Sequence, residues 1–368
     1  MNGRPPLGVV GGGLAGLAAA IAAAQRGREV VVWESGTIGR DKVCGEFLSP
    51  EAEEDLDALG CGDLTSALTP APLRSVALFG AGGARLDLTL PGRPALGLTR
   101  AALEAYLARR ARDAGATVLE RTPVRAMAPS PPRALEIQSQ AGAHAVRGLV
   151  LSMGKRSTLD APLDLPRARA DRPSFVALKA YCAPTPLEAD VELYFVPGGY
   201  IGVNPVEDGR IGVCALLDGD ARPGWQTLEA HASRHPALAR RLAALGAPTQ
   251  KPRGLARFGF GPQAVARACP TTGVPLLFAG DAARLVPSFT GDGMAIALRS
   301  GRLAALATFS PDPIRAYTRA FTRAFAARFV VAGALHGLLL HAPVFELLAP
   351  LVGRAPRIVD MLYRATRG

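Results

Sequence analysis

The sequence lacks the features that disulfide-rich, metal-binding and membrane-spanning proteins need. Its five cysteines are widely spaced and none belongs to a C-x-x-C pair, so neither a disulfide framework nor a zinc site is predicted. The five histidines show no metal-ligand spacing, which predicts no metal site. The stretch closest to a membrane span, residues 329–352, contains two histidines, a glutamate and two prolines, so no transmembrane helix is expected. A reducing, cytoplasmic location fits these absences.

Negative charge is also in short supply. The chain has 31 acidic and 42 basic residues among its 368, which leaves a net charge of +11. The basic residues are scattered, with no basic tail and no basic patch interleaved with aromatic residues. The sequence therefore predicts no nucleic-acid partner, and solvated arginine-rich faces account for the excess. A positive surface would, however, attract a dinucleotide cofactor.

Residues 7–34 organise the chain and read LGVVGGGLAGLAAAIAAAQRGREVVVWE. A short apolar run of buried-strand type leads into Gly11, Gly13 and Gly16, which form a G-x-G-x-x-G pattern. Residues 14–26 predict an alanine-rich helix whose N-terminal N–H groups face phosphates. Residues 30–33 predict a second strand, and Glu34 at its tip can accept hydrogen bonds from a ribose diol. Because all parts of a βαβ unit occur in order, the sequence predicts a dinucleotide site.

The rest of the chain predicts two kinds of sheet joined by helices. A hairpin at residues 75–79 and 85–90, a helix at 98–114 opened by Thr99 and a strand at 117–120 come first. Strand patterns separated by turn residues are typical of an antiparallel sheet. These patterns lie at 174–182, 190–196, 200–203, 210–217 and 254–261, with one helix expected at 227–245. Residues 276–280 predict a return to a buried parallel strand, and 313–367 are expected to be helical.

A second glycine motif follows that parallel strand. Asp281 comes directly after Gly280 at the strand tip, where a carboxylate can hydrogen-bond a ribityl hydroxyl. Gly291 and Gly293 then open a helix, whose N-terminus can stabilise negative charge on a reduced flavin ring. Together with the βαβ unit, this motif indicates that the dinucleotide carries a flavin.

On these residues the sequence resembles the FAD-dependent oxidoreductases of the geranylgeranyl reductase and aromatic-ring hydroxylase (flavoprotein monooxygenase) superfamily, over nearly the whole chain. The resemblance also rests on the run DKVCGE at residues 41–46, on Arg100 and on Pro287. It implies an α/β fold: a Rossmann-like FAD-binding domain of the GR2 type, an inserted antiparallel substrate domain and a C-terminal helical region. The implied segments are 1–74, 96–165 and 270–312 for FAD binding, 75–95 and 166–269 for the substrate domain, and 313–368 for the C-terminal helices.

The resemblance also implies roles for individual residues. Glu34 would bind the adenosine ribose, Arg100 would contact FAD near its phosphates, and Asp281 would hold the ribityl chain. Backbone N–H groups at Gly293 and Met294 would face the flavin pyrimidine edge. The implied FAD-binding set is Gly11, Gly13, Leu14, Ala15, Gly16, Glu34, Ser35, Lys42, Cys44, Gly45, Arg100, Val124, Gly154, Gly280, Asp281, Pro287, Gly291, Asp292, Gly293 and Met294.

Three residues are the catalytic candidates. The Cys44-Gly45-Glu46 loop resembles a loop of the reductase branch that lies near the flavin. This implies that Cys44 tunes the ring or delivers a proton and that Glu46 does acid–base work. Packing as a small apolar residue is the alternative for Cys44. Tyr200 resembles the tyrosine of a Y-x-W-x-F-P element and would place a hydroxyl in the substrate pocket. Since Gly202 stands at the tryptophan position and Asn204 at the phenylalanine position, a geranylgeranyl substrate is in question.

Three functions stay open at this stage. The favoured one is monooxygenation of a lipophilic phenolic, polyketide-like or isoprenoid-like compound through a flavin C4a-hydroperoxide. The second is flavin hydride reduction of a carbon–carbon double bond. The third is a non-catalytic flavin or lipid carrier, against which the flavin edge at residues 291–294 argues. Halogenation is not expected, because the chain has only two tryptophans and no W-x-W-x-I-P element.

The electron source and the C-terminal segment leave further alternatives. Met153 stands where the hydroxylase branch has an aspartate linked to NAD(P)H handling, so NAD(P)H as a transient reductant and a separate electron donor both stay open. The apolar C-terminal helices are either a lid on the FAD domain or a peripheral membrane contact for a hydrophobic substrate. In the second case, Arg354, Arg357, Arg364 and Arg367 would lie at the headgroup level.

Overall fold

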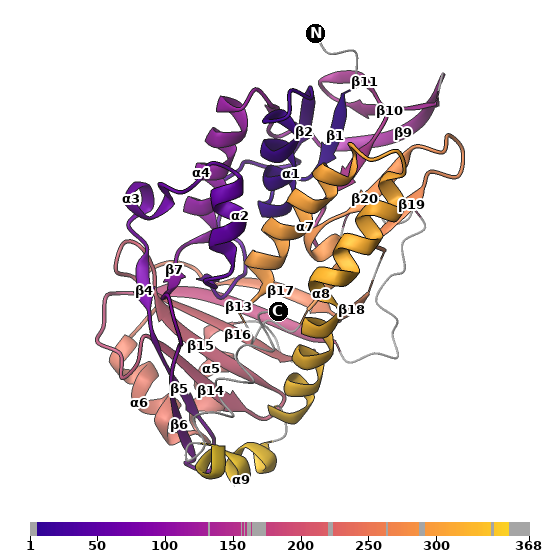
Figure 1. The fold of residues 1–368 in the computed structure, drawn as a ribbon. Coiled ribbons are helices and arrows are strands. Elements are labelled where there is room, and N and C mark those ends of the chain that lie inside the picture. Colours follow the sequence, from indigo (N-terminus) through magenta and orange to yellow (C-terminus); the bar gives the residue numbers. More distant parts are fainter. Residues whose placement is uncertain are drawn as a thin grey trace.

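The computed structural model describes residues 6–131, 133–155, 157, 159, 163, 174–219, 224–262, 264–286, 291–339 and 342–352. Figure 1 shows an upper half built on a mostly parallel sheet and a lower half built on a larger, mostly antiparallel one. The upper half holds both glycine motifs, which lie almost 270 residues apart in sequence. The fold is therefore the α/β architecture expected from the sequence.

The upper sheet has six strands in the order β19-β20-β12-β1-β2-β8. All neighbours are parallel except β19, which pairs antiparallel with β20. The strands are β1 (Leu7–Val10), β2 (Val30–Trp33), β8 (Thr117–Leu119), β12 (Leu149–Leu151), β19 (Ala266–Ala268) and β20 (Pro275–Phe278). Strands β1, β2 and β12 are buried along their whole length, because both faces of a parallel sheet are covered.

Helices cover one face of this sheet and a small antiparallel sheet covers the other (Figure 1). The covering helices are α1 (Leu14–Ala24), α4 (Arg100–Asp113), α7 (Gly293–Ala307) and α8 (Pro313–Leu339). The small sheet contains β9 (Val124–Ser130), β10 (Ala134–Ser139) and β11 (Gly142–Val146). On that side the His144 ring meets Trp33 edge-on, with ring centroids 5.5 Å apart. The βαβ unit predicted for residues 7–34 is confirmed.

The lower sheet has seven strands in the order β17-β13-β16-β15-β14-β5-β6. Every pairing is antiparallel except that of β5 with β14, which is parallel. The strands are β5 (Ser75–Phe79), β6 (Arg85–Thr89), β13 (Phe175–Cys182), β14 (Val191–Val196), β15 (Gly199–Pro205), β16 (Ile211–Asp218) and β17 (Arg253–Phe258). The predicted strands are confirmed, and the early hairpin β5–β6 joins strands that lie a hundred residues further along the chain.

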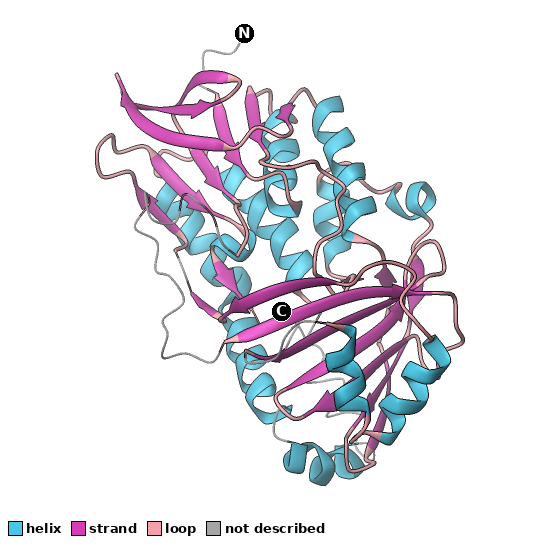
Figure 2. Cartoon of the chain, turned by 180° about the vertical axis from the view of Figure 1, so that it is seen from behind, coloured by secondary structure: helices cyan, strands magenta, loops and turns pink. Residues whose placement is uncertain are grey.

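The single helix predicted at residues 227–245 is wrong. Two helices, α5 (Trp225–Ala232) and α6 (Pro236–Leu245), lie there and cover the outer face of the lower sheet (Figure 2). The break falls at His235, because the residue before a proline is disfavoured from the helical conformation. His235 instead caps α6, and its Nδ1 accepts a hydrogen bond from the N–H of Leu238 at 3.3 Å.

Short elements join the two halves. Strands β3 (Phe47–Leu48), β4 (Ala71–Leu73) and β7 (Ala95–Gly97) form a three-stranded sheet between them. The remaining short elements are α2 (Ala52–Ala58), α3 (Leu64–Leu68), β18 (Gly261–Pro262), η1 (Gly280–Ala282) and β21 (Arg284–Leu285). After α8 the chain ends its described part in α9 (Ala342–Val352). Among the described helices, none is long and apolar enough to cross a membrane.

Candidate active site

The first glycine turn leaves the N-terminus of α1 open to a ligand. Gly11 has φ +102°, and a Cβ atom there would collide with the carbonyl group of Ser152. A Cβ on Gly16 would collide with the Gly11 carbonyl oxygen. At Gly13, the N-cap of α1, a Cβ would meet only the tips of Glu104, Arg100 and Lys42 at 3.7–3.9 Å. The backbone N–H groups of this helix start therefore lie beside polar side chains and suit an anionic ligand.

Glu34, at the end of β2, lies against the glycine turn and is only 6% exposed. Its carboxylate accepts hydrogen bonds from the N–H of Gly12 at 2.8 Å and from the N–H of Gly36 at 2.9 Å. The N–H of Thr122 donates to the carbonyl oxygen of Glu34 at 2.8 Å, two residues before Val124. The structure thus brings Glu34 and Val124 to the same end of the turn, while the roles of both in FAD binding stay predictions.

Arg100 lies on the other side of the turn, at the start of α4. Thr99 caps this helix as predicted, its Oγ1 accepting from the N–H of Ala102 at 3.1 Å. The Arg100 guanidinium donates to Glu104, which also accepts from Lys42 Nζ at 2.8 Å and is fully buried. Burial opposes the charge of Arg100, yet the Glu104 carboxylate raises its pKa above the ordinary value. Arg100 is therefore a permanent cation beside the N-terminus of α1.

The Nε atom of Arg100 indicates where a ligand would bind. The Nε–H group is buried and has no hydrogen-bond partner among the described residues. A buried, unpaired donor on a cation is unfavourable unless a ligand supplies the acceptor. A diphosphate at the N-terminus of α1 would supply anionic oxygens to Arg100 and to the free N–H groups. The residues present therefore fit the diphosphate of FAD.

The second glycine motif lies next to the first. Gly280 has φ +62°, and a Cβ there would lie 3.1 Å from Ala15 in α1 and 3.7 Å from Ala297 in α7. Its N–H donates to Ser300 Oγ at 2.9 Å. Asp281 follows in η1 and interacts electrostatically with Arg100. The strand tip, the start of α7 and the first turn of α1 thus meet at one place, as a single dinucleotide requires.

The start of α7 also meets the C-G-E loop. Gly291 has φ +74°, and a Cβ there would collide with the ring of Phe47, directly after the loop. Among the described residues, nothing lies within 4 Å of the position where Gly293 or Gly45 would carry a side chain. Met294 is 3% exposed in the first turn of α7. The open backbone at Gly293 fits the predicted contact with the flavin edge, which stays a prediction.

Glu46 anchors the C-G-E loop to the lower sheet. It is a non-glycine residue with φ +55°, and its side chain is 1% exposed. Its carboxylate accepts from the N–H of Arg100 at 2.8 Å, from Tyr181 Oη at 2.8 and 2.9 Å, and from Lys179 Nζ. Burial raises the pKa of Glu46, against the lowering effect of Lys179 and the N–H and O–H donors. The carboxylate that was predicted to act on substrate is thus enclosed by protein donors.

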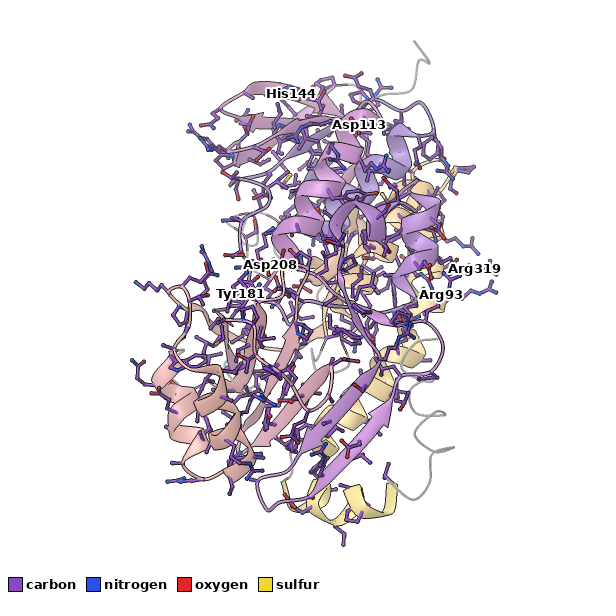
Figure 3. All side chains as sticks on the ribbon, turned by 90° about the vertical axis from the view of Figure 1, so that its left-hand side faces the viewer. Arg93, Asp113, His144, Tyr181, Asp208 and Arg319 are labelled. Atoms are coloured by element: carbon purple, nitrogen blue, oxygen red, sulfur yellow. The ribbon has the colours of Figure 1, made fainter. Side chains whose placement is uncertain are left out.

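Lys179 and Tyr181, which hold Glu46 in place, both lie on β13. Lys179 is 3% exposed, and its Nζ lies 4.5 Å from the centroid of the Tyr181 ring. The Arg210 guanidinium covers the same ring at 4.2 Å. Figure 3 shows Tyr181 near Asp208, in the region where the upper and lower halves meet. The two halves are therefore joined through a buried cluster of Glu46, Lys179 and Tyr181, called here the inner cluster.

The face of the lower sheet that carries the inner cluster, called here the inner face, changes from polar to apolar. One row of register partners runs Lys179, Cys214, Gly202 and Leu193 across β13, β16, β15 and β14. Cys214, Gly202 and Leu193 are half-buried. Burial raises the pKa of the Cys214 thiol to about 12, with Cys44 adding to the shift. Proton-bearing groups thus lie at one end of the inner face.

Tyr200 lies in the adjacent row of the inner face. Its register partners are Leu216 on β16 and Phe195 on β14. The ring is 7% exposed and belongs to an apolar cluster that also contains Leu285 and Phe345. The structure therefore brings Tyr200 onto the same face as Cys214, among apolar side chains, while its role as a substrate hydroxyl stays a prediction.

The other expected residues are placed as follows. Cys44 is half-buried, and its Sγ accepts from the N–H of Glu46 at 3.4 Å. Ser35 follows Glu34 and donates to that carboxylate at 3.4 Å. Gly154 has φ +77° in the turn after β12. Asp292 is the N-cap of α7. Pro287 lies outside the described residues.

Sequence reasoning missed Glu104, Lys179 and Tyr181. Glu104 stands one helical turn after Arg100, a spacing at which opposite charges pair. Lys179 is the only charged residue in a fully buried strand, FVALKAYC, and a buried lysine requires a partner. These signals flag the residues but do not identify Glu46 as the partner. Among the described residues, no group of three or more His, Cys, Asp or Glu side chains could hold a metal ion.

Comparisons with known proteins agree with this geometry. The model of the NAD(P)-binding Rossmann-like domain matches residues 9–47. The chain is 30% identical to the menaquinone reductase of Mycolicibacterium smegmatis over 388 residues, which cover 99% of this chain and 91% of that protein. It is 29% identical to the menaquinone reductase of Mycobacterium tuberculosis over 373 residues, covering 97% and 89% of the two chains.

Solved structures share the fold at lower identity. A geranylgeranyl bacteriochlorophyll reductase-like protein from Thermoplasma acidophilum matches with a TM-score of 0.76 and 22% identity, covering 99% of this chain and 96% of that one. The flavin-dependent brominase Bmp2 matches with a TM-score of 0.79 and 15% identity, covering 99% and 93%. PqsL from Pseudomonas aeruginosa, described as a probable FAD-dependent monooxygenase, matches with a TM-score of 0.74 and 18% identity, covering 93% and 98%.

Proposed function

This chain belongs to the family of the mycobacterial menaquinone reductases and is an FAD-dependent oxidoreductase, and from this premise we propose that it reduces a carbon–carbon double bond in a lipophilic, isoprenoid-bearing quinone. Menaquinone carries such double bonds in its isoprenoid chain. The relatives therefore favour the second of the reactions that the sequence left open. The oxygen-transfer reaction that the sequence analysis favoured is the competing outcome of the assay below.

The proposal rests on the change from polar to apolar side chains across the inner face. Thiol, ammonium and phenol groups gather at the β13–β16 end of that face, beside the C-G-E loop. Away from this end the inner face is apolar, with Leu193 partly exposed and Phe195 and Leu78 buried. An isoprenoid chain has no polar group to satisfy, so it would lie on the apolar part and present a double bond to the proton-bearing end.

Reduction of a double bond adds a hydride to one carbon and a proton to the other. When bound, FAD supplies the hydride and is reduced again by NAD(P)H or by a separate electron donor. Cys44 Sγ is the proposed proton donor, because it is half-buried in a loop that Glu46 holds against the start of α4 and whose neighbour Phe47 lies against Gly291 before α7. The thiolate formed in this step regains its proton from solvent.

Glu46 is in this proposal a positioning residue rather than an acid or base. Its three partners are the N–H of Arg100, Lys179 Nζ and Tyr181 Oη. These partners bind its carboxylate from two sides: Arg100 belongs to the FAD-binding half, and Lys179 and Tyr181 belong to the lower sheet. Such an anchor sets the distance between the cofactor-binding helices and the inner face. Small misplacements of reacting groups lower rates by about a hundredfold.

The test is the product formed from menaquinone by the FAD-loaded protein. The enzyme is reduced without oxygen, mixed with menaquinone in detergent, and the extracted lipid is analysed by mass spectrometry. A gain of two hydrogen atoms in the isoprenoid chain is the expected result. A gain of one oxygen atom in the presence of air would favour oxygen transfer instead. Unchanged lipid under both conditions would contradict both reactions.

Cysteine variants test the proton donor. Cys44→Ala is expected to lower the rate of double-bond reduction by about a hundredfold while flavin content is kept. Cys269→Ala is the matched control, because Cys269 is also half-buried but hydrogen-bonds Thr271 in a turn of the upper half. Equal rates for the two variants would remove Cys44 from the reaction and leave the FAD assignment intact.

An aspartate pair tests the cofactor site separately. Asp281→Ala is expected to weaken FAD binding by at least about tenfold, since it removes a hydrogen-bond acceptor at the strand tip. Asp113→Ala at the exposed end of α4 is the control, and it should keep the flavin of the native protein. Flavin retention after purification and the Kd from fluorescence quenching report the result. An Asp281 variant that purifies with full flavin would contradict the assignment.

A further inference from the structure

Helix α9 is apolar on the side that faces outward. Its only charged residue, Glu346, lies beside the β5–β6 turn and accepts from the N–H of Gly82 at 2.7 Å and the N–H of Ala84 at 2.9 Å. Its outer side presents Leu347, which is 69% exposed, and Pro350. A helix surrounded only by water usually shows the opposite pattern. The outer side of α9 is therefore suited to an apolar environment.

The inner side of α9 belongs to the apolar cluster that contains Tyr200. Phe345 and Ala349 are each 2% exposed and lie in the same apolar cluster as Tyr200. The Phe345 ring is 4.8 Å from that of Phe195, on the inner face of the lower sheet. One helix thus separates the apolar outer surface from the apolar cluster of the candidate site.

Helix α8 precedes α9 in the chain, contacts it and adds positive charge. Its inner side is an aromatic ladder of Tyr317, Phe321, Phe325 and Phe329. Its outer side begins with exposed Arg315, Arg319 and Arg323 at one-turn spacing, and the label in Figure 3 marks Arg319 at the edge of the molecule. None of these three side chains forms an ion pair within the described part of the chain. The outer side then continues with Ala326, Ala327, Val330, Gly333 and Ala334.

Val330 and Leu347 stand out by their exposure. They are 73% and 69% exposed and are the exposed large apolar side chains among the described residues. Both lie on the outer side of α8 and α9, beyond the arginine stripe of residues 315, 319 and 323. A surface with basic groups at one end and bare apolar groups at the other matches the headgroup and acyl layers of an anionic bilayer.

We propose that the outer side of α8 and α9 docks on an anionic phospholipid bilayer. Arg315, Arg319 and Arg323 bind lipid phosphates, and Val330 and Leu347 enter the boundary between headgroups and acyl chains. The net charge of +11 attracts the whole molecule to such a surface. The docking brings α9, and behind it the cluster that contains Tyr200, next to the lipid phase. The inference does not rest on the proposed reaction, because docking needs no turnover.

Vesicle co-sedimentation of the full-length, FAD-loaded protein tests the proposal. Vesicles of phosphatidylglycerol mixed with phosphatidylcholine are compared with pure phosphatidylcholine. Each arginine near an anionic bilayer strengthens partitioning about fivefold. The triple variant Arg315→Glu, Arg319→Glu, Arg323→Glu is thus expected to bind phosphatidylglycerol vesicles at least about a hundredfold more weakly. Binding of the native protein should weaken in about 1 M salt, where the screening length is about 3 Å.

A second pair of variants separates docking from charge alone. Val330→Ser with Leu347→Ser is expected to weaken vesicle binding several-fold at every salt concentration, because it removes only apolar contact. The control reverses three exposed arginines elsewhere, Arg125→Glu, Arg234→Glu and Arg240→Glu, at the same change in net charge. The control should retain most of the binding. Flavin content and circular dichroism confirm that each variant is folded.

Three outcomes would overturn the proposal. The native protein fails to sediment with phosphatidylglycerol vesicles, or the control loses as much binding as the arginine-stripe variant. Alternatively, sedimentation velocity shows a dimer that the Val330 and Leu347 variant dissolves, which would make this surface an interface between two copies of the chain. A protein that docks but does not reduce menaquinone would contradict the proposed function alone.

Discussion

Two buried clusters on opposite faces of the lower sheet pair a glutamate with a tyrosine and a cation. On the inner face, Glu46 meets Lys179 and Tyr181. On the outer face, Glu192 is fully buried and accepts from Tyr194 Oη at 2.5 Å and from Arg241 at 2.6 and 2.7 Å. The chemistry is nearly the same, so the difference between the clusters lies in what each one connects.

The outer cluster connects elements that carry no candidate function. Arg241 lies on α6 and forms two parallel hydrogen bonds to Glu192, a geometry that holds a helix on a sheet. The inner cluster connects β13 with the loop that carries Cys44 and with the backbone of Arg100. Its cation is a lysine, a point charge on a flexible stem. The comparison indicates that the rigid Arg241–Glu192 pair stabilises the fold. The more flexible Lys179–Glu46 pair aligns the two halves.

The largest expected effect is the loss of the outer pair. Arg241→Ala leaves Glu192 buried with only the Tyr194 hydroxyl and the N–H of Glu188. Breaking a buried ion pair from one side lowers the free energy of unfolding by about 3–5 kcal/mol. Urea unfolding measures the change, and flavin content of the folded fraction should not fall. The exposed neighbour substitution Arg240→Ala should stay within about 0.5 kcal/mol. A loss below about 1 kcal/mol for Arg241→Ala would contradict the structural role.

The inner pair is expected to affect rate more than stability. Lys179→Met removes the charge, and Glu46 can then take up a proton, because burial already raises its pKa. We therefore expect a smaller loss of unfolding free energy than for Arg241→Ala, but a fall in kcat of about a hundredfold with FAD retained. Steady-state kinetics with menaquinone separates kcat from KM. A variant with native kcat would show that the inner cluster does not align the site.

The pH dependence of stability sharpens the same contrast. Because the pKa of Glu46 is raised in the folded protein above its value of about 4.5 in the unfolded chain, the folded state binds this proton more tightly. Its contribution to stability is complete below the unfolded pKa and is lost as the pH rises through the folded pKa. As the pH rises above about 4.5, native protein should therefore lose stability relative to Glu46→Gln. Parallel urea-unfolding profiles for the two proteins would contradict the raised pKa.

The smallest expected effects come from exchanging the two cations. Arg241→Lys keeps the charge but loses one of two parallel hydrogen bonds, so a loss of about 1 kcal/mol in unfolding free energy is expected. Lys179→Arg keeps the charge beside Glu46 and should lower kcat by less than about tenfold. Thermal unfolding and kcat are measured for both variants. If Lys179→Arg lowered the unfolding temperature more than Arg241→Lys, the comparison would be reversed.

Local sequence patterns predicted the parts of the fold that depend on local interactions. The glycine turn at residues 11–16 needs close backbone approach, and Thr99 caps α4 through a contact three residues away. Strand-like runs separated by turn residues predicted the strands of the lower sheet. The break between α5 and α6 was also readable, because His235 precedes a proline, although the prediction joined them into one helix.

The candidate site was predictable only as separate pieces. The glycine turns and the C-G-E loop were expected to lie near a flavin, and the structure brings Phe47 against Gly291. That Glu46 would be enclosed by Lys179 and Tyr181 was not predictable, because these residues are more than 130 positions away in sequence. A carboxylate in a polar loop shows no local sign of the strand that will cover it.

The sequence by itself determined the dinucleotide-binding unit, the strand segments of the lower sheet and the apolar character of the C-terminal helices, since each depends on contacts within a few residues. Only the tertiary structure decided which glutamate aligns the two halves and which side of α9 faces outward. Glu346 lies beside the β5–β6 turn because the N–H groups of Gly82 and Ala84 donate to its carboxylate there. Neighbours that are distant in sequence decide whether a side chain is buried, paired or exposed. The same residue type can therefore hold two parts of the fold together in one place and form a docking surface in another.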